Sequence, residues 1–221
     1  MTARLLLAVA LLGCSGDKPV TVFAAASLTD ALTELGGARM HFAGSHRLLL
    51  QIREGAPADV VVVADAALLP DGVRVTCNTP VVVVPRGNPA GVTGVRDLHR
   101  AKRLVLGVPD VPVGRYAGQM VDAVPGLRRR LHIASYALHT RQVLAAVALG
   151  EADAGVVYRT DARASDAVQI VEVEADLRPR APYAAKALTA RGQAWLRRLR
   201  GPDGQALLAR HGFRRCEGDS P

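Results

Sequence analysis

The sequence predicts an α/β fold in which parallel sheets carry helices on both faces. Strand-like and helix-like segments alternate along most of the chain, which is the pattern of repeated β–α–β units. Residues 58–65 (ADVVVVAD) and 79–85 (TPVVVVP) are continuous apolar runs, as strands covered on both faces require. Apolar residues make up 49% of the 221 residues and charged residues 22%, a composition typical of globular chains.

The predicted elements of the first part begin with a buried strand over residues 19–25 (PVTVFAA). Apolar side chains recur at helical spacing over residues 28–35, which predicts a helix directly behind that strand. A short strand over 40–44 (MHFAG) and a helix over 45–55 follow, and Gly55 gives this helix its C-terminal stop. The two apolar runs complete this part of the alternation.

The alternation resumes after a Gly/Pro-rich segment, residues 85–94, which marks a boundary between domains. The chain is long enough for one large domain or two small ones, each with its own core. The strands predicted in the second part are residues 102–110, 131–138, 152–158 and 168–175. The helices predicted there are residues 113–124 and 139–151 and a pair within 189–213 that is broken at Gly201-Pro202.

Residues 1–13 are expected to form a signal peptide of the lipoprotein type. Arg4 supplies a positive charge, an apolar stretch follows, and LLGC places small residues before Cys14. The apolar stretch is too short to cross a bilayer core, which needs about twenty residues. Cys14 would then carry the lipid, in a periplasmic or otherwise extracytoplasmic protein anchored to a membrane. An ordinary secretory signal, or an apolar segment without a role, remains the alternative.

The formal net charge of +8 raises the question of a nucleic-acid partner. The basic residues are scattered, however, and cluster only at residues 128–130 and 195–200, without interleaved aromatic residues. We therefore interpret these clusters as solvated helix faces and expect no nucleic-acid partner.

The remaining cysteines, Cys77 and Cys216, have no second ligand at metal-site spacing, and the histidines show none either. An exported protein can form a disulfide between them, but no spacing favours one, so the pairing stays open. Asp59 and Asp65 flank one predicted strand, where structural capping explains them better than paired acid–base chemistry. Phosphate-binding loops, nucleophile elbows and zinc-protease motifs are absent from the sequence, and we expect no enzyme and no cofactor.

Four predicted junctions between a strand and a helix carry small or hydroxyl residues. They lie at Ser27, Ser45, Val113–Gly114 and Thr140. In an open parallel sheet, ligands collect beyond the carboxyl ends of the strands, where helix starts offer unpaired N–H groups to an anion. We expect Ser27 and Ser45 to be N-caps whose hydroxyl protons remain free for that anion, although plain N-caps without a ligand are the commoner case.

The sequence resembles the molybdate-binding proteins of ABC transporters. The motifs VFAAASL (22–28), GAPADV (55–60) and GVVY (155–158), with RGPDGQALLARHGF (200–213) at the end, carry the resemblance, which covers most of residues 19–215. It implies the two-lobed type II periplasmic binding protein fold, with each lobe a mostly parallel sheet flanked by helices. It also implies lobe I from residues 15–81 and 182–221, lobe II from residues 82–181, and a two-segment hinge near residues 79–86 and 180–187.

By the same resemblance, five residues hold the oxyanion: Ser27, Ser45, Val113, Thr140 and Tyr158. The two serines would give hydroxyl and backbone N–H groups, Val113 and Thr140 backbone N–H groups, and Tyr158 its phenol O–H. Molybdate or tungstate would bind there as an intact oxyanion, with no direct cation ligands from the protein. Molybdate and tungstate carry no proton near neutral pH, so a pocket made only of donors suits them, whereas phosphate would leave its own proton unmatched.

The implied function is capture of molybdate or tungstate and delivery to a membrane permease by a monomeric protein. The alternatives are a binder of another oxyanion, such as sulfate, and a degenerate member that acts as a sensor or interaction module. The segments 34–41 and 67–79 are shorter than is usual in the family. His46 and Arg47 also stand where the family tends to have small hydroxyl residues, so Arg47 would either attract the dianion or fill the site.

Overall fold

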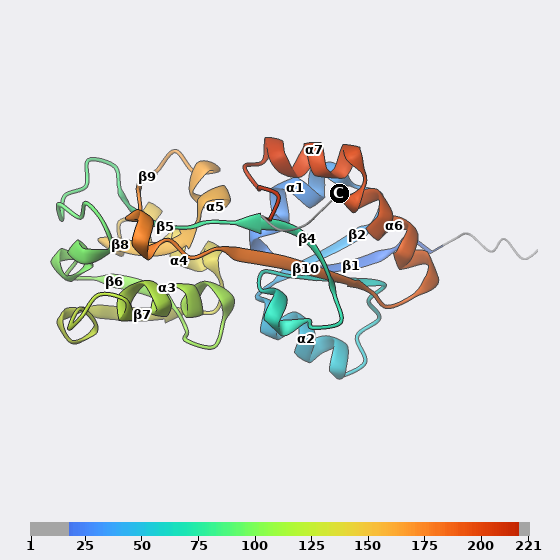
Figure 1. Ribbon diagram of the computed structural model, residues 1–221, viewed down its shortest axis with the longest axis horizontal. Coiled ribbons are helices and arrows are strands. Elements are labelled where there is room, and N and C mark those ends of the chain that lie inside the picture. The colour runs from blue at the N-terminus through green and yellow to red at the C-terminus, as the bar shows by residue number, and fades with distance from the viewer. Residues whose placement is uncertain (1–17, 217–221) are drawn as a thin grey trace, which may run out of the picture.

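The computed structural model describes residues 18–216, in two five-stranded sheets that lie side by side (Figure 1). The predicted leader and Cys14 lie outside the described residues. The first sheet, in the order β2-β1-β3-β10-β4, comprises β1 (Thr21–Ala25), β2 (Arg39–Ala43), β3 (Val60–Val63), β4 (Val73–Asn78) and β10 (Ala181–Ala187). The second, in the order β7-β6-β8-β5-β9, comprises β5 (Pro80–Pro85), β6 (Leu104–Gly107), β7 (Ile133–Ala137), β8 (Ala154–Tyr158) and β9 (Val168–Val171).

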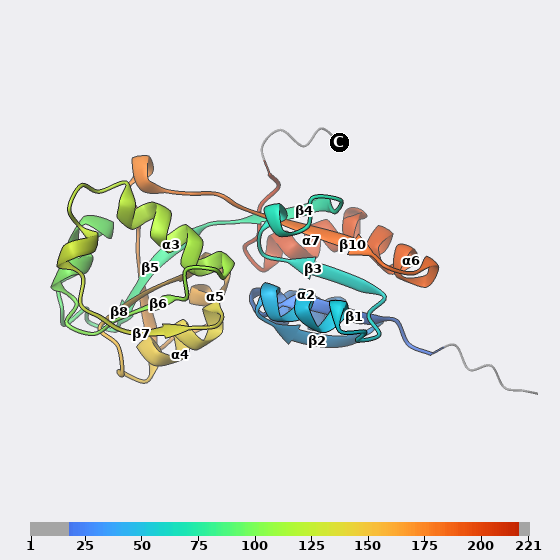
Figure 2. The same cartoon turned by 90° about the horizontal axis from the view of Figure 1, so that it is seen from below.

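Helices pack on both sheets. The α-helices are α1 (Thr29–Leu35), α2 (Ser45–Arg53), α3 (Pro112–Asp122), α4 (Thr140–Ala148), α5 (Arg159–Arg163), α6 (Ala190–Arg200) and α7 (Pro202–Arg210). Short 3₁₀ helices are η1 (Ala26–Leu28), η2 (Ala66–Leu68), η3 (Val95–Arg100), η4 (Arg128–Arg130) and η5 (Ala175–Leu177). We call the first sheet with α1, α2, α6 and α7 lobe I, and the second sheet with α3, α4 and α5 lobe II (Figure 2).

Both sheets are mixed and follow the same plan. In each, three strands are parallel, β2-β1-β3 in lobe I and β7-β6-β8 in lobe II. The strand that arrives from the other lobe, β10 in lobe I and β5 in lobe II, runs antiparallel to both of its neighbours. The parallel strands therefore keep their carboxyl ends, and the helix starts behind them, at one edge of each sheet.

The chain crosses between the lobes twice. Thr79 alone separates β4 from β5, and residues 172–180 lead from β9 back to β10. These crossings lie within or next to the segments expected to form a hinge. The exact division into residues 15–81, 182–221 and 82–181 stays a prediction, because strand pairing does not show which parts move together.

The sequence analysis places no element at β4, α5 or β10. Strand β10 (APYAAKA) has a proline in its interior and a register shift between Tyr183 and Ala184, and both features mask a strand pattern. Only its pairing with β3 and β4 satisfies its backbone groups. These elements are therefore specified by tertiary contacts rather than by local periodicity.

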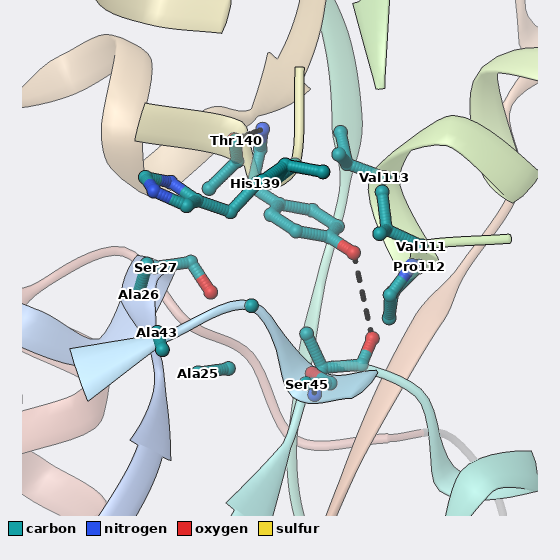
Figure 3. Close-up of a pocket in the computed structure, with 14 residues that line it drawn as sticks. Ala25, Ala26, Ser27, Ala43, Ser45, Val111, Pro112, Val113, His139 and Thr140 are labelled. Carbon is teal, nitrogen blue, oxygen red and sulfur yellow. Dashed lines mark hydrogen bonds between the residues drawn. The ribbon is translucent and has the colours of Figure 1, made fainter. Parts of the chain in front are cut away.

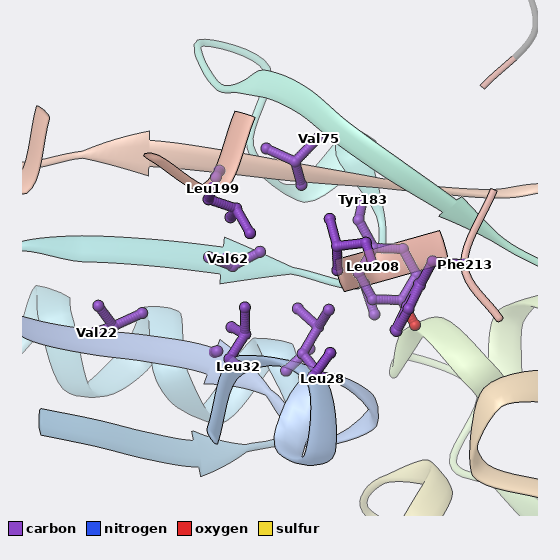
Figure 4. Close-up of a cluster of buried hydrophobic side chains, with 14 of the residues drawn as sticks. Val22, Leu28, Leu32, Val62, Val75, Tyr183, Leu199, Leu208 and Phe213 are labelled. Carbon is purple, nitrogen blue, oxygen red and sulfur yellow. The ribbon is translucent and has the colours of Figure 1, made fainter. Parts of the chain in front are cut away.

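The core of lobe I lies between its sheet and the helices α1, α6 and α7 (Figure 4). Val22 and Val62 from the strands meet Leu32 from α1 and Leu208 from α7 in one buried cluster. Cys77 of β4 is bonded to Cys216, which settles the pairing that the sequence left open. The disulfide and a backbone bridge between Cys77 and Arg214 tie the end of the described chain to the strand that leads into the first crossing.

Candidate anion-binding site

A narrow pocket lies between the two lobes, and we call it the inner pocket. All five predicted residues line it: Ser27, Ser45, Val113, Thr140 and Tyr158. Ser27 and Ser45 face Val113 and Thr140 across the same space (Figure 3). None of the residues that line it is an aspartate, glutamate, lysine or arginine. The inner pocket is therefore walled by apolar groups, hydroxyls, backbone and the imidazole of His139.

Helix starts from both lobes converge on the inner pocket. Ser45 is the first residue of α2 and Thr140 the first of α4, while Ser27 lies in η1 just before α1. Helix α3 begins with Pro112, which has no N–H group, so Val113 supplies its first backbone donor. The first N–H groups of a helix have no partner within it, and the helix dipole adds positive potential there. The arrangement favours a small anion.

The expectation that Ser27 and Ser45 act as N-caps is wrong. Leu28 and Gly44 occupy the N-cap positions of α1 and α2, and neither helix start has a side-chain capping bond. The Ser45 hydroxyl oxygen instead accepts a hydrogen bond from the Ala64 backbone N–H at 3.0 Å. Because that oxygen acts as an acceptor, the Ser45 hydroxyl proton remains free to point into the inner pocket.

Ser27 is held by a tyrosine that the sequence analysis did not single out. Its hydroxyl oxygen lies 2.7 Å from that of Tyr183, a buried residue of β10. The Asn78 amide lies 3.4 Å from the same Tyr183 oxygen and donates to it. Either hydroxyl can donate in the Ser27–Tyr183 pair, and when Tyr183 donates, the Ser27 proton is left for a ligand. Burial raises the pKa of Tyr183 well above its usual value, which keeps the phenol protonated for this role.

Thr140 and Tyr158 contribute in different ways. The Thr140 hydroxyl donates to Asp161 at 3.1 Å and accepts from the Tyr158 backbone N–H at 3.3 Å, so only the backbone of Thr140 remains for a ligand. The Tyr158 hydroxyl reaches the Ala64 carbonyl of lobe I at 3.5 Å, a long and weak contact. Burial raises the pKa of Tyr158 well above its usual value, so its phenol is a donor at every pH of interest.

One buried carboxylate, Asp161, stands behind the site. It does not line the inner pocket, but it holds Thr140 and accepts from the Arg141 guanidinium at 2.9 Å. Burial raises the pKa of Asp161 to about 6, and Arg141 acts in the opposite direction. Arg141 also pairs with Asp30 of α1, and Arg115 of α3 pairs with Asp65. Two ion pairs therefore connect the lobes beside the inner pocket.

The lobes also touch through their backbones. A Cβ atom on Gly44 of lobe I would lie 2.7 Å from the carbonyl oxygen of Leu138 in lobe II, so only glycine fits this contact. His46 and Arg47 do not line the inner pocket; both line a neighbouring cavity, so Arg47 does not fill the site. Asp59 binds Thr21, Thr189 and Arg191, and Asp65 caps η2, which are the structural roles expected of them.

Neither a metal centre nor a membrane span is found in the part of the chain that the structure describes. Residues 18–216 hold no group of three or more His, Cys, Asp or Glu side chains able to bind a metal ion. None of their helices is both long and apolar enough to cross a membrane.

Residues 20–214 match a known protein family, described as bacterial extracellular solute-binding protein. The chain belongs to this family. It is a class of binding proteins and not of enzymes, which agrees with the expectation from the sequence. This match, with the relatives and solved structures described next, confirms the resemblance that the sequence motifs indicate and the predicted two-lobed fold.

Several relatives whose names state a function are moderately similar to this chain in sequence. The molybdate-binding protein ModA of Mycobacterium tuberculosis is 34% identical over 168 residues, which span 66% of this chain and 63% of that protein. ModA of Escherichia coli is 30% identical over 96% of this chain and 95% of its own length. A Bacillus subtilis protein named as an ABC transporter substrate-binding lipoprotein, YvgL, is 32% identical over 80% of this chain and 78% of its own.

Solved structures show the same fold at low identity. The sulfate-binding protein SubI from M. tuberculosis superposes with a TM-score of 0.76 at 17% identity, covering 91% of this chain and 88% of that one. The periplasmic molybdate-binding protein of Azotobacter vinelandii gives a TM-score of 0.67 at 19% identity, covering 88% and 98%. At such identities these structures establish the fold and leave the ligand open.

Proposed function

We propose that this solute-binding protein captures molybdate or tungstate in the inner pocket. The observation that carries the proposal is the convergence of Ser27, Ser45, Val113, Thr140 and Tyr158 on one cavity without a charged side chain in its wall. The relatives named as molybdate-binding proteins support the same ligand.

The chemistry of the wall explains the choice of ligand. Most polar groups of the wall are donors: helix N–H groups, the Ser27 and Ser45 hydroxyl protons and the Tyr158 phenol, which makes only a long bond to the Ala64 carbonyl. The imidazole of His139 also lines the pocket. A proton-free dianion satisfies the donors with its oxygen atoms. Hydrogen phosphate would bring a proton that finds no acceptor among them, at a cost of about 1–3 kcal/mol. Sulfate also lacks protons, so only its smaller size distinguishes it from molybdate at this site.

Delivery follows from the class. We propose that residues 15–81 with 182–221, and residues 82–181, move as two bodies about the crossings at Thr79 and 172–180 and close over the oxyanion. The closed, monomeric protein would then present the anion to the permease of an ABC transporter. A lipid on Cys14 would keep the protein at the membrane, and the likeness to the lipoprotein YvgL supports this anchor.

The test is a calorimetric titration of residues 15–221 with molybdate, tungstate, sulfate and phosphate. Molybdate or tungstate should bind most tightly, and Ser27→Ala combined with Ser45→Ala should weaken binding by about 2–5 kcal/mol, because oxyanion lone pairs lose their donors. Ser135→Ala, an exposed serine of β7, is the matched control and should bind like the wild type. A preference for sulfate would refute the proposed ligand and support the alternative of a sulfate-binding protein. If no oxyanion binds, the alternative of a sensor or interaction module would be favoured.

A further inference from the structure

A buried carboxylate lies directly behind the donors that lobe II contributes to the inner pocket. The side chain of Asp161 in α5 is fully buried and does not line the pocket. Its Oδ2 atom accepts from the Thr140 hydroxyl at 3.1 Å, and its Oδ1 atom accepts from Nε of Arg141 at 2.9 Å. Because Thr140 does line the pocket, Asp161 contacts the wall of the site without belonging to it.

A doubly charged anion in the pocket and an ionised Asp161 behind Thr140 repel each other. Buried surroundings screen this repulsion poorly. The wall does not compensate for it, since none of the residues that line the pocket is an arginine or a lysine. Arg141 bonds to Asp161, but it shares its charge with Asp30 of lobe I. The bound anion therefore favours the neutral form of Asp161.

The other titratable groups around Asp161 do not remove this repulsion. Tyr158 of β8 and Tyr183 of β10 are fully buried phenols, and burial raises the pKa of each well above its usual value, so both are neutral. Asp30 of α1 acts on Asp161 in the same direction as burial. Burial already raises the pKa of Asp161 to about 6, and a dianion beside Thr140 would raise it further.

Protonation of Asp161 also changes what Thr140 can offer. While Asp161 is ionised, the Thr140 hydroxyl donates to it and accepts from the Tyr158 backbone N–H at 3.3 Å. A protonated carboxyl has an O–H donor of its own, and a threonine oxygen has two lone pairs. Asp161 can then donate to Thr140, and the Thr140 proton is free for an oxygen atom of the ligand. One proton thus removes a negative charge and adds a donor.

We propose that Asp161 takes up a proton from the solvent when a doubly charged oxyanion binds in the inner pocket. Asp161 is then a positioning residue that acts through Thr140, and oxyanion binding weakens as the pH rises. The inference rests on the proposed function, because it requires an oxyanion beside Thr140. It adds to that function a proton that accompanies the anion.

The first experiment titrates residues 15–221 with molybdate in buffers of different ionisation enthalpy. The dependence of the measured heat on the buffer gives the number of protons taken up. About half to one proton per molybdate is expected at pH 7, and the affinity should fall about five- to fiftyfold from pH 6 to pH 8. A heat independent of the buffer, or an affinity independent of pH, would overturn the proposal. A wild type that binds no oxyanion would refute the proposed function and this inference with it.

Asp161→Asn tests the residue. Asparagine resembles the protonated acid, because its oxygen can accept from Arg141 while its NH₂ group donates to Thr140. The variant should take up no proton and should bind molybdate at pH 8 about tenfold more tightly than the wild type. A purely structural role for Asp161 predicts the opposite, a loss of affinity at every pH. Asp153→Asn, at a carboxylate of lobe II that pairs with Arg103 outside the pocket wall, should keep the uptake and the pH dependence.

His139 is the competing site for the proton, because its imidazole lines the inner pocket. Burial, with Arg141 nearby, lowers the pKa of His139. His139→Asn should keep the proton uptake. Loss of the uptake in His139→Asn but not in Asp161→Asn would overturn the proposal.

Infrared difference spectra of the wild type, with and without molybdate, need no variant. A band of a protonated carboxyl group should appear when molybdate binds, and its absence in a protein that binds molybdate would overturn the proposal while leaving the proposed function intact. Thermal melting of each variant verifies that it is folded.

Discussion

The Ser27 hydroxyl oxygen of η1 lies 2.7 Å from the hydroxyl oxygen of Tyr183 in β10, although the two residues are 156 positions apart in sequence. Tyr183 belongs to the strand that follows the second crossing between the lobes. The hydroxyl that faces the inner pocket is therefore oriented by a residue next to the proposed hinge.

Tyr183→Phe should weaken oxyanion binding about two- to tenfold, although Tyr183 does not line the inner pocket. Without the tyrosine oxygen, Ser27 must find another partner for its lone pair or turn its proton away from the ligand. Calorimetric titration with molybdate measures the change. Tyr136→Phe, at a half-exposed tyrosine, should bind like the wild type. Equal affinities for all three proteins would show that Tyr183 does not orient Ser27.

Gly44→Ala should weaken binding by at least about tenfold and leave the fold intact. The new Cβ would lie 2.7 Å from the Leu138 carbonyl oxygen. This distance is a steric clash, so the two lobes could not approach each other as closely as they do here. The backbone at Gly44 has φ −63° and ψ 140°, which alanine adopts without strain. Small-angle scattering with saturating molybdate should show a more open protein.

Gly118→Ala is the matched control for that prediction. Its Cβ would meet only the end of the Arg128 side chain at 3.5 Å, inside helix α3. Affinity should be unchanged, and alanine in a helix interior should stabilise the protein by up to about 1 kcal/mol. A loss of affinity similar to that of Gly44→Ala would mean that the lobe contact is not the cause.

Asp30→Asn should lower affinity by up to about fivefold, with a smaller effect at high salt. Asp30 of lobe I pairs with Arg141 of lobe II beside the inner pocket, and an exposed pair of this kind contributes about 0.2–1 kcal/mol. Glu34 is a second exposed carboxylate of α1, but its partners Arg210 and His211 lie in the same lobe. Glu34→Gln should therefore leave affinity unchanged. Titrations at low and high ionic strength compare the two variants, and an equal loss in both would refute an inter-lobe role for Asp30.

Asp161 predicts a pH dependence of stability. Its pKa in the folded protein is raised to about 6 from an ordinary 3.8, so between these values the folded state binds more protons than the unfolded state. The contribution of Asp161 to the free energy of unfolding is then fully present below about pH 4 and is lost as the pH rises through 6. The loss is about 3 kcal/mol for a shift of about two pKa units.

Asp161→Asn isolates this effect, because the amide has no proton to lose. The free energy of unfolding of the variant, measured with urea from pH 4 to pH 7, should gain about 3 kcal/mol relative to the wild type across that range. The other carboxylates contribute equally to both proteins and cancel in the difference. A difference that does not change with pH would show that Asp161 is ionised throughout.

Cys216→Ser should lower the free energy of unfolding by about 2–5 kcal/mol, since the disulfide with Cys77 closes a loop of 139 residues. Reduction of the wild type with dithiothreitol should reproduce the loss, and the reductant should leave the variant unchanged. Equal denaturation midpoints for oxidised and reduced wild type would contradict this account.

Most of the local elements, although not β4, α5 or β10, can be read from the sequence, and so can the residue types at the candidate site. Composition and spacing indicate the apolar strands β3 and β5 and the small residues at the starts of η1, α2 and α4. These features can be predicted because they depend on neighbours in the chain. Ser27, Ser45, Val113 and Thr140 stand at such junctions, and Tyr158 comes from the family resemblance. All five line one pocket, and their binding of an oxyanion stays a prediction.

The partners that hold those donors follow from tertiary contacts. Ser45 binds Ala64 and Ser27 binds Tyr183 instead of capping their helices, and the Cys77–Cys216 bond joins residues 139 positions apart. Strand β10 likewise exists because β3 and β4 satisfy its backbone. The physical reason is common to all of these: each partner is brought near by the packing of two sheets and two crossings, and such contacts leave no periodic trace in the sequence.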